Sequence, residues 1–98
     1  MQYLILGYDG KDKDALMRRI CARAEHLALG SKLIKEGKLH YGVAMLDEKE
    51  RMIGSVYVCE FASKKELNAW LKVEPYVTGK VWKKITISPC KVGPSFSK

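Results

Sequence analysis

Residues 39–61 read LHYGVAMLDEKERMIGSVYVCEF, in which two apolar runs are separated by a short charged segment. Runs of this length that are rich in Val, Ile and Tyr are typical of β-strands. The charged residues 47–51 between them favour a hairpin loop. We therefore expect antiparallel strands over residues 39–46 and 53–61, and this hairpin forms one half of the predicted sheet.

A long helix is predicted before the hairpin, over residues 13–36. Its apolar residues recur at steps of three, four and seven, which is one stripe of a 3.6-residue period; they are Leu16, Ile20, Ala24, Leu27 and Ile34. Asp12 is the predicted N-terminal cap and Gly37 the predicted stop. A straight helix of this length is unusual in so small a domain, so we expect a kink or break within residues 21–24.

Two more strands and a second helix complete the predicted chain. Residues 2–8 (QYLILGY) form a strand before the long helix, and residues 80–88 form the last strand. Ser63 and Glu66 have the spacing of a capping box, in which each side chain bonds to the other residue's amide. The helix that they open is predicted to stop at Pro75, which has no amide proton. Its inward-facing side chains are Leu67, Trp70 and Leu71.

The predicted order β-α-β-β-α-β defines an α+β, ferredoxin-like sandwich with both helices on one face of an antiparallel sheet. A strand with one face in water should alternate apolar and polar residues. Residues 3–6 are apolar throughout, and Val56 and Val58 flank the apolar Tyr57. Because the helices cover only one face, we expect the other face to pack on a second copy of the chain. A homodimer with a shared or paired cavity follows from this pattern.

The length of 98 residues and the mass of 11.1 kDa correspond to one domain over residues 1–98, with a loosely held tail expected at 90–98. The chain is 47% apolar and 30% charged, as globular proteins are. No run approaches the ~20 apolar residues of a membrane helix, and no signal peptide is recognisable. We expect a soluble cytoplasmic protein. The net charge of +7 favours anionic partners.

The three cysteines are an odd number without a CxxC pair. Neither a disulfide framework nor a zinc site is therefore predicted. We interpret Cys21 and Cys59 as small buried apolar residues, whereas Cys90 lies near the tail. No metal ligand set is expected in this chain.

Two histidines and one corner with a carboxylate are the candidates for chemistry. His40 lies in a predicted strand, where a packing or edge role is favoured. His26 lies at the margin of the helix stripe, where an isolated histidine is more often structural. A nearby carboxylate would raise its basicity and fix its tautomer, as a general base requires. Glu74 follows the second helix, and Pro75 would aim it and Tyr76 into a cavity.

Together these segments resemble the YciI-like (YCII-related) family over residues 1 to about 89. The resemblance rests on short motifs in the family's order, namely Arg23-Ala24-Glu25-His26-Leu27, Gly37, Ile53-Gly54-Ser55, Glu74-Pro75-Tyr76 and Ile87-Ser88-Pro89. It implies a dimeric α/β barrel of the ferredoxin-like type with a histidine–carboxylate site, which maps to His26 and Glu74. Two positions depart from the family pattern: Glu74 replaces an aspartate, and Val43 replaces the proline that follows Gly42.

The resemblance also implies an activity. One activity of the family is dehydrochlorination of a chlorinated hydroxyhydroquinone, which needs acid/base groups but no metal or redox cofactor. On this hypothesis the chain is a cofactor-independent lyase that acts on a phenolic or anionic small molecule. His26 would be the acid or base, and Glu74 would tune it. Arg23 would supply a cationic environment, and Ser55 and Tyr76 would bind substrate oxygens.

Two other classes remain open on the sequence alone. In a non-enzymatic ligand-binding or interaction module, His26 and Glu74 would be unpaired and side chains would fill the cavity. RNA-binding domains share the strand order, and the positive charge favours RNA. Residues 52–58 (MIGSVYV), however, lack the paired aromatic residues of an RRM. We therefore expect neither nucleic-acid nor membrane partners.

Overall fold

The computed structural model describes residues 1–97. The elements follow the predicted order, with an additional short helix before the last strand and a 3₁₀ helix near the C-terminus. They are β1 (Gln2–Asp9), α1 (Ala15–Lys35), β2 (Leu39–Leu46), β3 (Met52–Glu60), α2 (Lys64–Leu71), α3 (Pro75–Thr78), β4 (Trp82–Cys90) and η1 (Pro94–Phe96). Among the described residues, no helix is long and apolar enough to span a bilayer.

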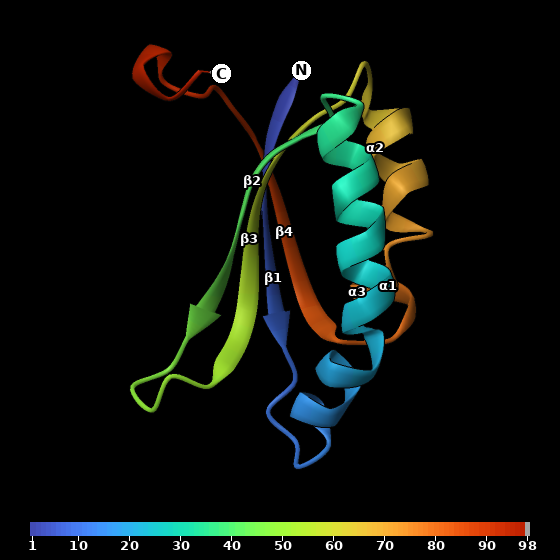
Figure 1. The fold of residues 1–98 in the computed structure, drawn as a ribbon, viewed down its shortest axis with the longest axis vertical. Coiled ribbons are helices and arrows are strands. Elements are labelled where there is room, and N and C mark those ends of the chain that lie inside the picture. Colours follow the sequence, from blue (N-terminus) through green and yellow to red (C-terminus); the bar gives the residue numbers. More distant parts are fainter. Residues whose placement is uncertain (98) are drawn as a thin grey trace.

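The four strands form one antiparallel sheet in the order β2-β3-β1-β4. Figure 1 shows α1, α2 and α3 on one side of this sheet, so that the molecule has two layers. The predicted α+β, ferredoxin-like sandwich is therefore confirmed. The hairpin strands lie within one residue of their predicted bounds, while β4 begins and ends two residues later than predicted.

The long helix α1 differs from the prediction at its start and in its middle. It runs unbroken over 21 residues, including positions 21–24, where a kink or break was expected. Asp14 rather than Asp12 is the N-cap residue, and Asp12 pairs with Arg18 at 2.6 Å instead. The stop at Gly37 is as predicted, because this residue has a φ of 74°, a left-handed conformation that glycine adopts without strain.

The buried face of α1 also differs from the predicted apolar stripe. That stripe lies largely in solvent, and Leu27, for example, is 50% exposed. The residues that face the sheet lie one position earlier, at intervals of seven; they are Arg19, His26 and Leu33. One position is a rotation of about 100° around the helix axis. The helix therefore turns a partly polar face towards the sheet, and that face carries the candidate histidine.

The two helices between β3 and β4 each begin with a side-chain cap. Ser63 Oγ accepts a hydrogen bond from the Glu66 amide at 3.2 Å, as predicted, while the Glu66 carboxylate lies 3.3 Å from Lys38 Nζ. Pro75 does not stop α2, which ends before it. Pro75 instead occupies the first turn of α3, where a backbone amide has no acceptor within the helix, so the missing amide proton costs no hydrogen bond. Glu74 is thus the N-cap residue of α3.

The sheet face opposite the helices is apolar at its centre. Leu4 pairs with Val58 across β1 and β3, and Leu6 pairs with Val56. On the edge strand β2, Val43 also pairs with Val56 and is 59% exposed. Paired residues lie on the same face of a sheet. Both faces of the sheet are therefore apolar, as the sequence indicated. That a second copy of the chain covers the face opposite the helices stays a prediction.

The three cysteines lie in different environments. Cys59 is buried in the core between the sheet and the helices, as predicted. The prediction for Cys21 is wrong, because the rotation of α1 turns this position to solvent. Cys90 is partly buried at the end of β4.

The tail predicted over residues 90–98 makes two specific contacts within its described part. The Val92 amide donates to the side-chain oxygen of Gln2 at 2.7 Å. The Tyr41 hydroxyl donates to the carbonyl of Phe96. Lys98, the last residue of the predicted tail, lies outside the described residues.

Candidate active site

The carboxylate of Glu74 is buried at the start of α3, where the residue is only 2% exposed. Its Oε2 accepts a hydrogen bond from the Tyr76 amide at 3.1 Å. This cap satisfies one of the first amides of the helix, which have no partner within it. Such partners are needed, because an unpaired charge inside a protein is strongly destabilising.

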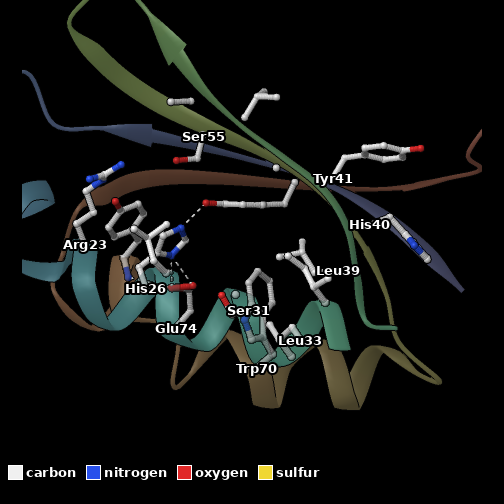
Figure 2. A pocket seen from close by; sticks show the side chains of 18 of the residues that line it. Arg23, His26, Ser31, Leu33, Leu39, His40, Tyr41, Ser55, Trp70 and Glu74 are labelled. Carbon is white, nitrogen blue, oxygen red and sulfur yellow. Dashed lines mark hydrogen bonds and ion pairs between the residues drawn. The ribbon is translucent and has the colours of Figure 1, made fainter. Parts of the chain in front are cut away.

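His26 reaches this carboxylate from α1. Its Nδ1 lies 2.7 Å from Oε1 and 3.1 Å from Oε2 of Glu74 (Figure 2). Because a carboxylate only accepts hydrogen bonds, Nδ1 carries a proton and Nε2 holds the lone pair of the neutral ring. His26 is 7% exposed, so it lies inside the fold rather than at the margin of the helix.

Tyr76 lies between His26 and Arg19. The tyrosine ring is parallel to the imidazole, with ring centroids 3.7 Å apart and 6° between the planes. The guanidinium carbon of Arg19 lies 4.8 Å from the centroid of the same tyrosine ring. Since Arg19 and His26 are about two turns apart on α1, the ring fills the space between them. The stack restricts the imidazole to one orientation.

Arg19 belongs to a buried cluster that the sequence analysis did not find. Its Nε lies 2.7 Å from Asp9 Oδ2, and the two side chains are 3% and 4% exposed. Its Nη2 donates to Ser55 Oγ at 2.7 Å, and Trp82 Nε1 donates to the same oxygen at 3.2 Å. Burial lowers the pKa of Arg19, but the hydrogen bond and charge of Asp9 outweigh it and raise the pKa, so the guanidinium stays charged. The Ser55 and Tyr57 side chains are also hydrogen-bonded, and this contact on its own lowers the pKa of Tyr57.

Tyr57 of β3 is a second site residue that the sequence analysis missed. Its hydroxyl is hydrogen-bonded to Nε2 of His26. Its ring lies across Gly42 of β2, its cross-strand partner, where a Cβ would lie 2.5 Å from the ring carbon Cε1. Any side chain at position 42 would therefore displace the Tyr57 ring. A symmetric hairpin around residues 47–51 would pair position 42 with position 56. A register shift between Met45 and Leu46 pairs it with Tyr57 instead, so this glycine–aromatic pair could not be found from the sequence.

These side chains line a pocket of about 500 Å³. Its polar part includes Arg19, Arg23, His26, Ser55, Glu74 and Tyr76. Its apolar part includes Leu27, Leu33, Ile34, Leu39 and Trp70. Figure 2 shows the labelled polar residues Arg23, His26 and Glu74 on one side, and the labelled apolar residues on the other. A pocket of this volume and lining suits a small ring that carries polar groups at one end.

All five residues predicted from the sequence line this one pocket, although their roles stay predictions. Arg23 does so as an exposed side chain of α1. Burial raises the pKa of Tyr76, and the charges of Arg19 and Arg23 oppose that rise. His40 lies towards the other end, with Nε2 2.7 Å from Glu60 Oε1. In residues 1–97 there is no group of three or more His, Cys, Asp or Glu side chains that could hold a metal ion.

Comparison with known proteins identifies the family. Residues 1–91 match the YCII-related domain. The chain belongs to the YCII-related family. Protein YciI of Escherichia coli is 31% identical over 97 residues, which cover 93% of this chain and 97% of that protein. The YciI protein of Shigella flexneri has the same identity and coverage. The resemblance drawn from the short motifs is thus confirmed.

Two solved structures resemble this YCII-related domain. A 5-chloro-2-hydroxyhydroquinone dehydrochlorinase from Burkholderia phenoliruptrix, in complex with 2,5-dihydroxybenzoquinone, has a TM-score of 0.80 and 26% identity. The match covers 97% of this chain and 98% of that one. A dimeric ferredoxin-like protein of unknown function from Jannaschia has a TM-score of 0.55 and 16% identity, with 93% and 98% covered. At that identity the second comparison concerns the fold alone.

Proposed function

We propose that this member of the YCII-related family is a cofactor-independent lyase that carries out acid/base chemistry on a phenolic or similarly anionic small molecule. The observation that carries the proposal is the buried contact between His26 Nδ1 and Glu74 beside an open pocket. Burying ionisable groups is costly, so their convergence on a cavity favours a catalytic role over a plain interaction module.

Dehydrochlorination of a chlorinated hydroxyhydroquinone is the reaction that we propose. The similarity to the Burkholderia dehydrochlorinase, at a TM-score of 0.80, supports this choice. A base removes a phenolic proton, and an acid protonates the ring carbon that carries chlorine. Chloride then leaves from the keto tautomer as a second hydroxyl loses its proton. One HCl is lost overall and a hydroxyquinone remains, so no external oxidant is required.

The chain supplies a group for each part of this reaction. His26 exchanges the proton, and Glu74 stabilises the imidazolium that forms, because an adjacent carboxylate favours the charged ring. The cations Arg19 and Arg23 favour the phenolate and the departing chloride. The Ser55 hydroxyl is placed to bind a substrate oxygen, with two donors already fixing its position.

The proposal includes a homodimer. Its support is the apolar face formed by the pairs Leu4–Val58 and Leu6–Val56, which α1, α2 and α3 leave uncovered because they lie on the other side of the sheet. Apolar surface of this kind is stabilised by burial against a second copy.

Chloride release from a chlorinated hydroxyhydroquinone tests the proposed function. An ion-selective electrode would follow the reaction under anaerobic conditions, which suppress spontaneous oxidation of the quinol. His26→Ala should fold normally, because alanine is a good helix former, and should lower turnover by ~10²–10⁴-fold. Ile20→Ala is the control, since Ile20 is an exposed residue of the same helix that does not line the pocket.

The possible outcomes separate the substrate from the mechanism. Unchanged release by a folded His26→Ala protein would remove His26 from the reaction. No release by the unsubstituted protein from any chlorinated quinol would reject this substrate. In that case a ligand-binding module becomes the better description unless another phenol is turned over.

A further inference from the structure

Both ring nitrogens of His26 are already engaged within the chain. Nδ1 contacts Glu74 at 2.7 Å, and Nε2 contacts the hydroxyl of Tyr57. With the proton of the neutral ring on Nδ1, Nε2 accepts, and the Tyr57 hydroxyl must donate. The lone pair that a general base needs is therefore covered by a phenol belonging to the protein. Tyr57 also lines the pocket, so a ligand bound there can contact its oxygen.

The ring of Tyr57 is packed in this position. It lies across Gly42, where an added Cβ would be 2.5 and 2.7 Å from two of its ring carbons. The Trp82 ring flanks it with a centroid separation of 5.7 Å, and the imidazole of His26 flanks it at 5.5 Å. It also packs against both core clusters of the chain. Because close-packed side chains leave little room for reorientation, swinging the ring aside would disturb both strands of the hairpin.

We propose that Tyr57 is the catalytic residue that exchanges a proton with the substrate, and that it relays this proton to His26. The inference rests on the proposed acid/base function. In the forward step the Tyr57 hydroxyl gives its proton to Nε2 and receives the phenolic proton of the substrate. Tyr57 ends unchanged, the substrate becomes a phenolate, and His26 becomes an imidazolium paired with Glu74. No electron or other reactant is needed.

The surroundings of Tyr57 favour a concerted transfer. Burial and the nearby Glu74 carboxylate raise the pKa of its hydroxyl well above that of a free tyrosine. A free tyrosinate is therefore strongly disfavoured at neutral pH. The two protons move together, so the positive charge rests on His26 and the negative charge on the substrate. In the reverse direction the same hydroxyl returns a proton, as the acid step of the proposed reaction requires.

Ionisation of a coloured phenol tests the relay without relying on dehydrochlorination. para-Nitrophenol absorbs visible light only as its phenolate. It would be added to the full-length protein at a pH at which it is mainly neutral in solution. A protein that removes its proton should produce the phenolate absorbance on binding. The variants would be Tyr57→Phe, which keeps the packed ring, and His26→Ala. Tyr3→Phe is the matched control, because Tyr3 is a buried tyrosine of the same sheet outside the pocket.

Each outcome supports or overturns the inference. A phenolate signal in the unsubstituted protein and in Tyr3→Phe, lost in Tyr57→Phe and His26→Ala, supports the relay. A signal that persists in Tyr57→Phe but not in His26→Ala would mean that the substrate reaches His26 directly. The relay would then be wrong and the proposed function would stand. No signal in the unsubstituted protein would count against both.

Gly42→Ala provides a second variant in which the tyrosine hydroxyl is still present. The added Cβ must push the Tyr57 ring away, so its hydroxyl should lose the bond to His26. We expect loss of the phenolate signal with the circular dichroism of a folded protein. Chloride release by this variant should fall by ~10²–10⁴-fold, the scale for losing one acid/base group. A full signal in folded Gly42→Ala would show that the packed position of the ring is not required.

Discussion

The ring of Tyr76 lies parallel to that of His26, 3.7 Å away, while its own amide donates to the carboxylate that contacts the same imidazole. Tyr76 thus restrains His26 through its side chain and Glu74 through its backbone amide. Stacked aromatic pairs contribute about 0.5–1.5 kcal/mol beyond the area they bury. The orientation of the imidazole should therefore depend on an aromatic ring at position 76.

Two substitutions of Tyr76 should distinguish the role of its ring from the role of its hydroxyl. Tyr76→Phe keeps the stack and should raise KM without a large change in kcat, because only the proposed contact with a substrate oxygen is lost. Tyr76→Leu removes the stack and should lower kcat and the free energy of unfolding, the latter by ~1–3 kcal/mol. Steady-state chloride release and urea denaturation measure both effects. Equal kinetics for the two variants would argue against a role for the ring.

Two substitutions of Glu74 should distinguish its charge from its reach. Glu74→Gln keeps the shape and one acceptor oxygen but removes the charge that favours the imidazolium, so turnover should fall by less than in His26→Ala. Glu74→Asp keeps the charge but shortens the side chain by one methylene, which stretches the 2.7 Å contact. We expect Glu74→Asp to be partly active. Its free energy of unfolding should be about 1 kcal/mol lower, because the cap of α3 is weakened. If turnover of Glu74→Gln is as low as that of His26→Ala, the charge of Glu74 does more than tune His26 and this prediction is wrong.

Alkaline pH should destabilise the fold through buried acids that cannot easily ionise. Burial raises the pKa of the Cys59 thiol from 9.0 to about 12, and it also raises that of Tyr57. A raised folded-state pKa contributes stability that is complete below the unfolded value and is lost as the pH rises towards the folded value. The free energy of unfolding should therefore decline between about pH 9 and 12.

Cys59→Ala is the variant that tests this decline. It should be less stable than the unsubstituted protein at neutral pH, because packing around a buried sulfur is lost. It should nevertheless show a shallower decline in alkali, since no thiol remains to ionise. Urea midpoints recorded across the pH range measure both. Parallel curves for the two proteins would indicate that Cys59 does not contribute to the pH dependence.

The apolar open face of the sheet predicts a homodimer. Light scattering should give about twice the 11.1 kDa chain mass at micromolar concentration. Val56→Lys places a charge at the centre of this face and should yield monomers, because a charge there cannot be buried cheaply. Val73→Lys is the matched control, since Val73 is 61% exposed and lies outside the sheet. A monomeric unsubstituted protein would mean that the face is covered in some other way.

The order of elements could be predicted from the sequence because each strand and helix has local signals, such as the cap at Ser63 and the stop at Gly37. The orientation of α1 could not. Hydrophobic periodicity assigns Leu27 and its stripe to the core, yet the buried positions include Arg19 and His26. A functional site that buries polar side chains reverses the rule on which the periodicity depends.

The candidate site was partly predictable for a related reason. Glu74 and His26 are in motifs that the family shares, so their contact could be expected. Asp9 and Arg19 carry no such signal, because a buried ion pair looks like two surface charges in a sequence. Tyr57 was hidden differently: it was counted as an apolar strand residue, and only its pairing with Gly42 distinguishes it.

The missing side chain at position 42 also has an evolutionary consequence. Since the Tyr57 ring takes the volume that any Cβ there would fill, neither position is free to drift alone. A lineage that replaced the glycine would displace the tyrosine and with it the hydroxyl at the imidazole. A lineage that gave up the tyrosine would release the glycine from selection. The two positions should therefore be inherited as a pair, and a relative with only one of them has abandoned this arrangement of the pocket.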